Sequence, residues 1–199
     1  MFNKILIANR GEIAVRIMRT AKKMGIATVA VYSEADTNSL HVKEADEAVY
    51  IGPSPSVKSY LNIDSLLNAI QLSGADAVHP GYGFLSENAE FARRLQQAGV
   101  VLIGPSPEAV RKMGDKIESK KIALKAGVNS VPGVLEAISG PDAAKKVVAE
   151  IGYPVMIKAA AGGGGKGMRI ARNEKELLDG IKSAASEAAS SFKDDRVFI

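Results

Sequence analysis

A glycine-rich stretch preceded by a lysine is the part of this sequence best suited to chemistry with phosphate. Residues 153–169 read YPVMIKAAAGGGGKGMR, in which Lys158 ends an apolar run and residues 162–165 are four consecutive glycines. Glycine has no Cβ atom, so the backbone can approach a ligand closely, and successive N–H groups can form a concave anion site. The pattern predicts a glycine hairpin that folds over phosphates, with the Lys158 ammonium beside it.

A Walker A loop and a flexible surface hairpin are the two alternatives to this interpretation. A Walker A loop is excluded, because that motif needs Ser or Thr after its GK pair and then a helix, whereas Lys166 is followed by Gly167 and a strand-like run. A flexible surface hairpin with solvated lysines remains an alternative on glycine content alone. The lysine at the end of the preceding strand favours phosphate binding, and strand alternation places it on the same face as Met156.

The segment MGDK, residues 113–116, places a second lysine where a helix is expected to begin. The N-terminal end of a helix carries partial positive charge, so a lysine there is unfavourable unless an anion is bound nearby. Lys116 is therefore a candidate phosphate ligand. Taken alone, the segment favours the simpler interpretation of an ordinary exposed lysine.

The third candidate segment, residues 79–88, reads HPGYGFLSEN and follows a short apolar run. A segment after a strand lies at the carboxyl edge of a parallel sheet, where open α/β sheets bind ligands. Tyr82 and Glu87 are its candidate binding residues. His79 could act as a base, but a histidine that makes structural hydrogen bonds is the favoured interpretation.

Residues 8–14, ANRGEIA, stand where a dinucleotide-binding fold carries its glycine fingerprint. They lack the G-x-G-x-x-G spacing that brings a backbone close to a pyrophosphate. An NAD-binding domain is therefore disfavoured, although the fold expected here is of the kind that binds NAD.

The first hundred residues alternate short apolar runs with segments of helical periodicity. A parallel, doubly wound α/β sheet is the expected architecture, because strands separated by helices pair in parallel. The expected strands are residues 5–8, 26–32, 46–51, 76–79 and 100–103, and the expected helices are residues 12–24, 62–73 and 86–98, the last capped by Ser86.

The pattern changes after residue 114. A helix over residues 115–126 precedes a Pro- and Gly-containing segment, residues 128–140, which is the expected domain boundary. Further helices are expected over residues 142–150 and 174–190, with strands 154–159, 168–171 and 196–199. We therefore divide the chain into an N-terminal domain, residues 1–114, a linking helix, residues 115–130, and a small α/β unit, residues 131–199.

Composition excludes several classes of function. The 199 residues include no cysteine, which excludes disulfides, thiolate metal sites and a cysteine nucleophile. The net charge of +4 comes from scattered lysines and arginines without interleaved aromatic residues, so we expect no nucleic-acid partner. No apolar stretch has the length of a membrane span or a signal peptide. The expected location is the cytoplasm, or the mitochondrial matrix if a transit peptide has been removed.

Taken together, these motifs resemble the biotin carboxylase family of ATP-grasp ligases. The likeness runs over essentially the whole chain and is carried by HPGYGFLSEN, MGDKIESKK and GYPVMIKAAAGGGGKGMRIA. The sequence around the glycine loop and the segment EAASSFKDDRVFI are most similar to the alpha subunits of propionyl-CoA carboxylases. Acetyl-CoA, methylcrotonyl-CoA and pyruvate carboxylases share the same module. The resemblance implies a pre-ATP-grasp domain followed by an incomplete ATP-grasp flap domain.

The resemblance also implies an activity and its site residues. The family uses ATP and Mg²⁺ to activate bicarbonate and then carboxylates biotin on a carrier domain. The partners expected from the resemblance are ATP, bicarbonate, a biotin carrier domain and a carboxyltransferase subunit, and the longer protein is expected to be a homo-oligomer. Lys116 and Lys158 match the lysines that contact the ATP phosphates. Gly164 and Gly165 match the flap glycines over the nucleotide. Tyr82 and Glu87 match a loop at the biotin and bicarbonate end.

Three groups of family residues match no position of this chain: the adenine-contacting strand residues, the Mg²⁺-binding glutamates, and the bicarbonate- and biotin-binding arginines. We therefore expect no catalytic residue and no metal ligand within residues 1–199, and no carboxylation by this chain alone. Two other hypotheses stay open from the residues: another ATP-grasp ligase, such as a carbamoyl-phosphate or purine-pathway enzyme, and a self-standing nucleotide-binding module. The combination of HPGYGFLSEN with MGDK argues against the first of these.

Overall fold

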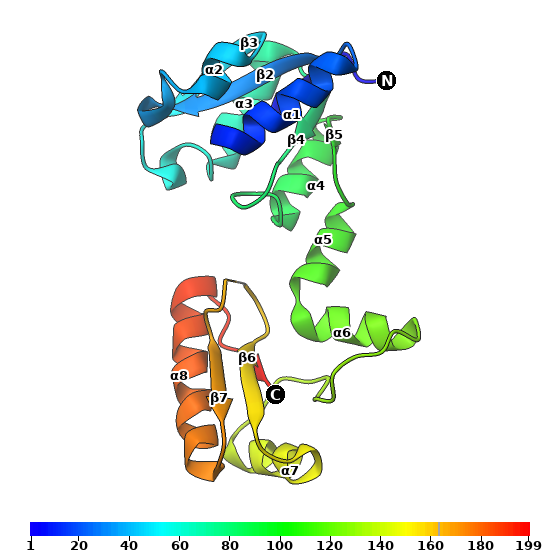
Figure 1. The fold of residues 1–199 in the computed structure, drawn as a ribbon, viewed down its shortest axis with the longest axis vertical. Coiled ribbons are helices and arrows are strands. Elements are labelled where there is room, and N and C mark those ends of the chain that lie inside the picture. Colours follow the sequence, from blue (N-terminus) through cyan, green and yellow to red (C-terminus); the bar gives the residue numbers. More distant parts are fainter. Residues whose placement is uncertain (163) are drawn as a thin grey trace. The chain divides into compact units, whose positions relative to one another are not determined.

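The computed structural model describes residues 1–162 and 164–199. The chain forms two compact units, Met1–Arg111 and Lys112–Ile199, and each is described by itself (Figure 1). No helix in the described ranges combines the length and the apolar character that a membrane crossing requires.

The first unit is built on a five-stranded parallel sheet, which confirms the predicted fold class. Its strands follow the spatial order β3-β2-β1-β4-β5. The strand order reverses between β1 and β4, so the loops that follow these two strands leave the sheet at its topological switch point. The strands are β1 Lys4–Ile7, β2 Ala27–Ser33, β3 Glu47–Gly52, β4 Ala77–His79 and β5 Val101–Leu102.

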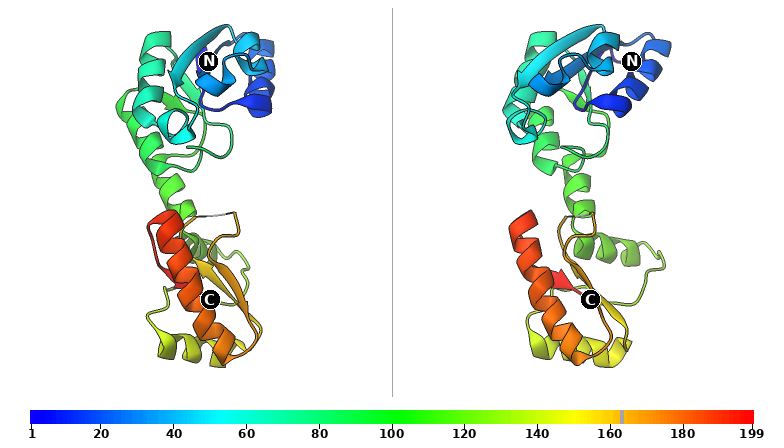
Figure 2. Two further views of the ribbon diagram at one scale, coloured as in Figure 1. Left: turned by 90° about the vertical axis from the view of Figure 1, so that its left-hand side faces the viewer. Right: turned by 60° about the vertical axis from the view of Figure 1, so that its left-hand side comes forward.

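Helices cover both faces of this sheet, as the two views of Figure 2 show. One apolar core lies between the sheet and the helices that include Leu66 and Phe91, and a second lies under the helix that includes Met18. The helices are α1 Gly11–Lys23, α2 Leu40–Glu44, α3 Ile63–Ser73 and α4 Ala89–Gln97, with short 3-10 turns at Glu34–Asp36 and Ser56–Lys58.

The predicted start of α4 is wrong by two residues. Asn88, not Ser86, caps the helix, because its side-chain oxygen accepts a hydrogen bond from the Phe91 N–H at 2.8 Å. The chain before it still turns: the Ser86 N–H donates to the Gly83 carbonyl at 2.9 Å. Ser86 is therefore engaged in this turn, and the helix begins only after it.

The second unit is a three-stranded antiparallel sheet in the order β7-β6-β8, with α8 along one face (Figures 1 and 2). A core that includes Ile157 and Leu177 joins this sheet to α7 and α8. The elements are α6 Lys116–Lys125, α7 Pro141–Ile151, β6 Val155–Ala159, β7 Met168–Ala171, α8 Glu174–Phe192 and β8 Val197–Phe198. α5, Pro107–Gly114, spans the division between the two units.

Helix α6 packs within the second unit. Ile117 on this helix forms a small apolar cluster with Ala160 and Phe198, against which Val134 also packs. The Val134 N–H donates to the Ile199 carbonyl at 3.0 Å, and this bond ties the segment after α6 to the end of β8. The helix that the sequence suggests as a link thus contacts, through its first turn, the strand ends beside the glycine loop.

Candidate functional site

The candidate site of the second unit is built on β6, whose two faces have different neighbours. Val155 and Ile157 are buried toward α8, whereas Met156 and Lys158 point to the other face, as the alternation predicts. Lys158 stands directly opposite Met168 on β7. Met156 and Met168 are 39% and 37% exposed, so two thioether side chains flank the lysine on a partly open surface.

The start of α6 is tied to the end of β6 by several contacts. Asp115 caps the helix through its side-chain oxygen, which accepts from the N–H groups of Ile117 and Glu118 at 2.9 and 3.0 Å. The Lys116 N–H donates to the Ala160 carbonyl at 3.0 Å. The Lys116 ammonium donates to the carbonyl of Gly162 in the glycine loop. Lys116 therefore reaches the loop that follows Lys158.

The loop glycines divide into two kinds. A Cβ atom at Gly162 would lie 2.2 Å from the Phe192 ring, and one at Gly167 would lie 2.7 Å from the Ala159 Cβ, so these two positions lack space for a side chain. Gly164 and Gly165 have φ angles of 70° and 80°, and a Cβ atom added to either would meet nothing within 4 Å. Their backbone is thus open on the side where a ligand could approach. Gly163, between them and Gly162, lies outside the described residues.

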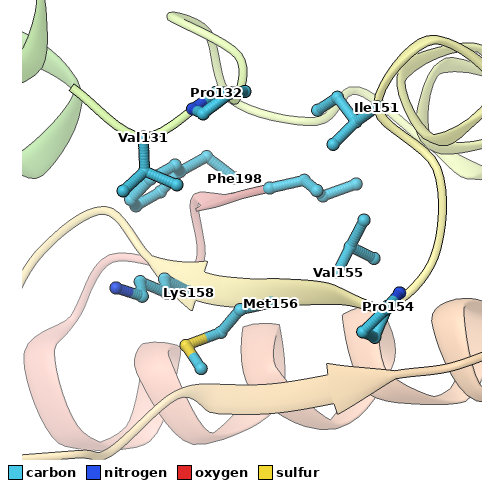
Figure 3. A pocket seen from close by; sticks show the side chains of 9 residues that line it. Val131, Pro132, Ile151, Pro154, Val155, Met156, Lys158 and Phe198 are labelled. Carbon is cyan, nitrogen blue, oxygen red and sulfur yellow. The ribbon is translucent and has the colours of Figure 1, made fainter. Parts of the chain in front are cut away.

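A cavity of about 470 Å³ lies beside Lys158. Figure 3 shows Val131 and Pro132 on one side of it, and Met156 and Lys158 on β6. Phe198 of β8 completes the wall that these residues form. The arrangement offers apolar walls to a flat ring and an ammonium to an anion, which together suit a nucleotide.

Sequence reasoning missed three residues of this site. Met156 was expected on the face of Lys158 but given no role, and Met168 becomes its neighbour only through the pairing of β6 with β7. Lys120 follows Lys116 by one helical turn, a spacing that places both on one side of α6. A role for Lys120 becomes visible only beside Lys158, which lies 38 positions further along the chain and whose charge lowers the pKa of Lys120.

The candidate segment of the first unit lies at the switch point of the parallel sheet. The buried Asn9, in the loop after β1, donates through Nδ2 to the carbonyl oxygens of Pro80 and Tyr82 at 2.8 and 2.7 Å. The Tyr82 hydroxyl donates to Glu12, and this contact raises the pKa of Tyr82. Tyr82 is 62% exposed and Glu87 is also exposed, so both side chains are accessible to a ligand.

His79 has a structural hydrogen bond, in agreement with the favoured interpretation. Its Nδ1 accepts from the Gly81 N–H at 3.0 Å, and burial lowers the pKa of the imidazole. A neutral ring with Nδ1 as acceptor stabilises the turn that follows β4.

Asp36 anchors a buried polar network beside this segment. Arg10 donates to Asp36 through Nε at 2.6 Å, and the Tyr60 hydroxyl donates to the same carboxylate at 2.7 Å. The hydrogen bond from Arg10 holds the pKa of Asp36 well below its usual range, and burial with the Asp36 contact raises the pKa of Tyr60 to about 12. Tyr60 also stacks on Phe84 with ring centroids 5.0 Å apart, so the network supports the loop that carries Tyr82.

Two family models match the chain. "Biotin carboxylase, N-terminal domain" matches residues 1–110, and "Carbamoyl-phosphate synthase L chain, ATP binding domain" matches residues 115–199. The second model covers the unit that holds Lys116, Lys158 and the glycine loop. Within the described residues, no three His, Asp or Glu side chains converge as a metal site.

Curated relatives span the whole chain. The propionyl-CoA carboxylase alpha chain of Ruegeria pomeroyi is 61% identical over 199 residues, and the mitochondrial one of Homo sapiens is 60% identical over 198 residues. Biotin carboxylase 1 of Bacillus subtilis is 53% identical over 199 residues. The chain spans 29%, 27% and 44% of the length of these three proteins, respectively.

Solved structures agree with these relatives. A complex of biotin carboxylase with β,γ-ATP from Campylobacter jejuni has a TM-score of 0.96 at 49% identity, and covers 100% of this chain and 44% of that one. The biotin carboxylase domain dimer of the Hydrogenobacter thermophilus 2-oxoglutarate carboxylase, in complex with MgADP, ADP and bicarbonate, has a TM-score of 0.95 at 46% identity, with the same coverage. The chain belongs to the biotin carboxylase family.

Proposed function

We propose that this chain supplies the N-terminal domain and the phosphate-binding flap of an ATP-dependent biotin carboxylase. The observation that carries the proposal is the position of Lys116 and Lys158 at one end of β6, where the Lys116 ammonium contacts the carbonyl of Gly162. Two ammonium groups beside an open glycine backbone form a site for a polyphosphate.

In this proposal each group of the second unit has a separate task. Lys116 and Lys158 hold the phosphates of ATP, and the open backbone at Gly164 and Gly165 closes over them. Met156 and Met168 offer an apolar surface to the adenine ring, because thioethers pack well against aromatic faces. As charge develops on the phosphates during transfer, fixed ammonium groups stabilise it more than they stabilise bound substrate.

The reaction proposed for the longer protein is the activation of bicarbonate by ATP, followed by carboxylation of biotin on a carrier domain. Tyr82 and Glu87 of the first unit face the biotin and bicarbonate end in this scheme. Mg²⁺ would offset the negative charge of the phosphates, and no residue of this chain is proposed to hold it, so we propose that this chain alone does not carboxylate biotin. The remaining partners are a carboxyltransferase subunit and a second copy of the carboxylase.

Propionyl-CoA is the acyl-CoA that we propose for this carboxylase. The support is the identity of about 60% to propionyl-CoA carboxylase alpha chains from a bacterium and from mitochondria, compared with 53% to the B. subtilis biotin carboxylase. The proposal places the protein in the cytoplasm or, because several relatives are mitochondrial, in the mitochondrial matrix.

A chimaera tests the proposed function directly. Residues 1–199 replace the matching part of B. subtilis biotin carboxylase 1, to which they are 53% identical. We expect ATP hydrolysis that depends on both bicarbonate and biotin, and we expect Lys158→Gln to reduce it. A well-folded chimaera that hydrolyses ATP equally well without bicarbonate would contradict the proposal.

A further inference from the structure

Three partly buried lysines lie close together in the second unit. Lys116 and Lys120 are one turn apart on α6, and Lys158 lies near the end of β6, just before Ala160, which the first turn of this helix contacts. Burial lowers the pKa of Lys120, and the positive charge of Lys158 lowers it further. Lys120 is the member of this group to which the family resemblance and the comparisons assign no role.

The Lys120 ammonium lies close to the segment after α6. A Cβ atom at Gly133 would lie 2.7 Å from the Lys120 Nζ and 2.6 Å from the Ile199 carbonyl oxygen. Glycine at position 133 therefore leaves the space that the ammonium occupies. Val131 and Pro132, just before this glycine, line the cavity beside Lys158 (Figure 3), and so does Ile199. The Lys120 ammonium therefore lies against the segments that form one wall of that cavity.

The carboxylates at the start of α6, Asp115 and Glu118, pair with groups other than Lys120. Asp115 accepts hydrogen bonds from the first turn of the helix and from Arg196 at 2.9 Å, and Glu118 pairs with the exposed Lys121 at 3.1 Å. Holding like charges together in a partly desolvated place is unfavourable, and an anion between them would offset the cost.

We infer that Lys120 is a third cationic ligand of the polyphosphate chain, beside Lys116 and Lys158. The inference rests on the proposed function, and it adds a specificity-determining residue to that site. The ligand chemistry is a di- or triphosphate, which requires more positive charge than a monophosphate does. Lys120 reaches the phosphates from the side of α6, whereas Lys158 reaches them from the sheet.

The test is a titration of the 199-residue chain, labelled with ¹⁵N and followed by NMR so that millimolar affinities are measurable. The probes are ATP, tripolyphosphate, AMP and adenosine. The variants are Lys120→Gln, Lys158→Gln and, as the matched control, Lys121→Gln on the next position of the same helix. Lys121 is exposed and paired with Glu118, so its loss removes one positive charge without touching the cavity.

We expect Lys120→Gln to raise the Kd for ATP and tripolyphosphate about tenfold, the size of one charge-assisted hydrogen bond. The Kd for AMP should rise less, and the Kd for adenosine should not change. In Lys121→Gln the Kd for every probe should stay within about twofold of the wild-type value, because a surface charge acts weakly. Lys120→Arg, which keeps the charge, should retain most of the affinity. Amide spectra that superimpose away from the site would show that each variant is folded.

The outcomes separate this inference from the proposed function. If Lys158→Gln weakens ATP binding but Lys120→Gln behaves like Lys121→Gln, the role of Lys120 is wrong and the proposed site stands. If ATP binds but tripolyphosphate does not, Lys120 does not contact the phosphates. If the wild-type chain binds no ATP, or if Lys158→Gln binds it as tightly as wild type, both ideas fail.

Discussion

The side-chain amide of Asn9 donates a hydrogen bond to the carbonyl oxygen of Tyr82 at 2.7 Å, across 73 positions of sequence. The same nitrogen donates to Pro80, and a Cβ atom at Gly81 would lie 2.7 Å from it. One buried amide thus joins the loops that follow β1 and β4, the two strands at which the sheet order reverses. This bond holds the backbone from which the Tyr82 side chain projects.

Asn9→Asp should destabilise the first unit by about 2–4 kcal/mol, because it sets a carboxylate against two carbonyl oxygens that lose their donor. The free energy of unfolding can be followed by tyrosine fluorescence, since Tyr153 is the only one of five tyrosines outside this unit. Asn68→Asp, at an exposed position of α3, is the control and should change stability by less than about 0.5 kcal/mol. Equal effects of the two substitutions would contradict the role given to Asn9.

The network around Asp36 should make the first unit sensitive to acid. The pKa of Asp36 is lower in the folded state than its unfolded value of about 3.9. The contribution of Asp36 to the free energy of unfolding is therefore fully present above the unfolded-state pKa, and it is lost as the pH falls toward the folded-state pKa. Asp36→Asn should cost roughly 2–4 kcal/mol at pH 7, since it leaves the Arg10 charge without its partner.

The measurement for Asp36 is urea unfolding of wild type and Asp36→Asn between pH 7 and pH 3. We expect the difference in unfolding free energy between them to shrink below about pH 4. Asp64→Asn is the control, because the Asp64 side chain is 82% exposed and its pairing with Arg94 contributes little. A difference that stays constant over the whole range would mean that Asp36 does not titrate as the network implies.

Sequence patterns predicted most of the fold because burial follows local periodicity. The two faces of β6 could be inferred from neighbouring residues alone. The start of α4 could not, because Ser86 and Asn88 both suit a cap and the choice depends on the turn that places Phe84 on Tyr60. Asn9 and Lys120 were missed for the same reason: their partners lie 38 or more positions away in the sequence.

The two kinds of loop glycine should respond differently to alanine. Gly165→Ala meets only the cost of a positive φ angle, about 1–2 kcal/mol, because its surroundings are open. Gly167→Ala adds a clash with Ala159 at 2.7 Å and should cost about 1–3 kcal/mol more. Hydrogen exchange of β6 and β7 amides in the two variants measures this difference in local stability. Equal protection in the two variants would show that the loop relaxes around Gly167.

In the chimaeric carboxylase, Lys158 is expected to bind the phosphates of ATP through its ammonium group. Lys158→Gln keeps the length of the side chain and removes its charge, so a charge-assisted contact worth roughly 1.5–3 kcal/mol is lost. The kcat/KM for ATP should fall about ten- to a hundredfold, whereas unfolding should hardly change, since a lysine at the end of a strand contributes little to the core. Lys158→Arg should also be impaired, because a planar guanidinium must fit between Met156 and Met168. Lys175→Gln, at an exposed position of α8, is the control and should keep wild-type kinetics. If Lys158→Gln kept wild-type ATP kinetics while the control behaved normally, the assignment of this loop to the ATP phosphates would be wrong.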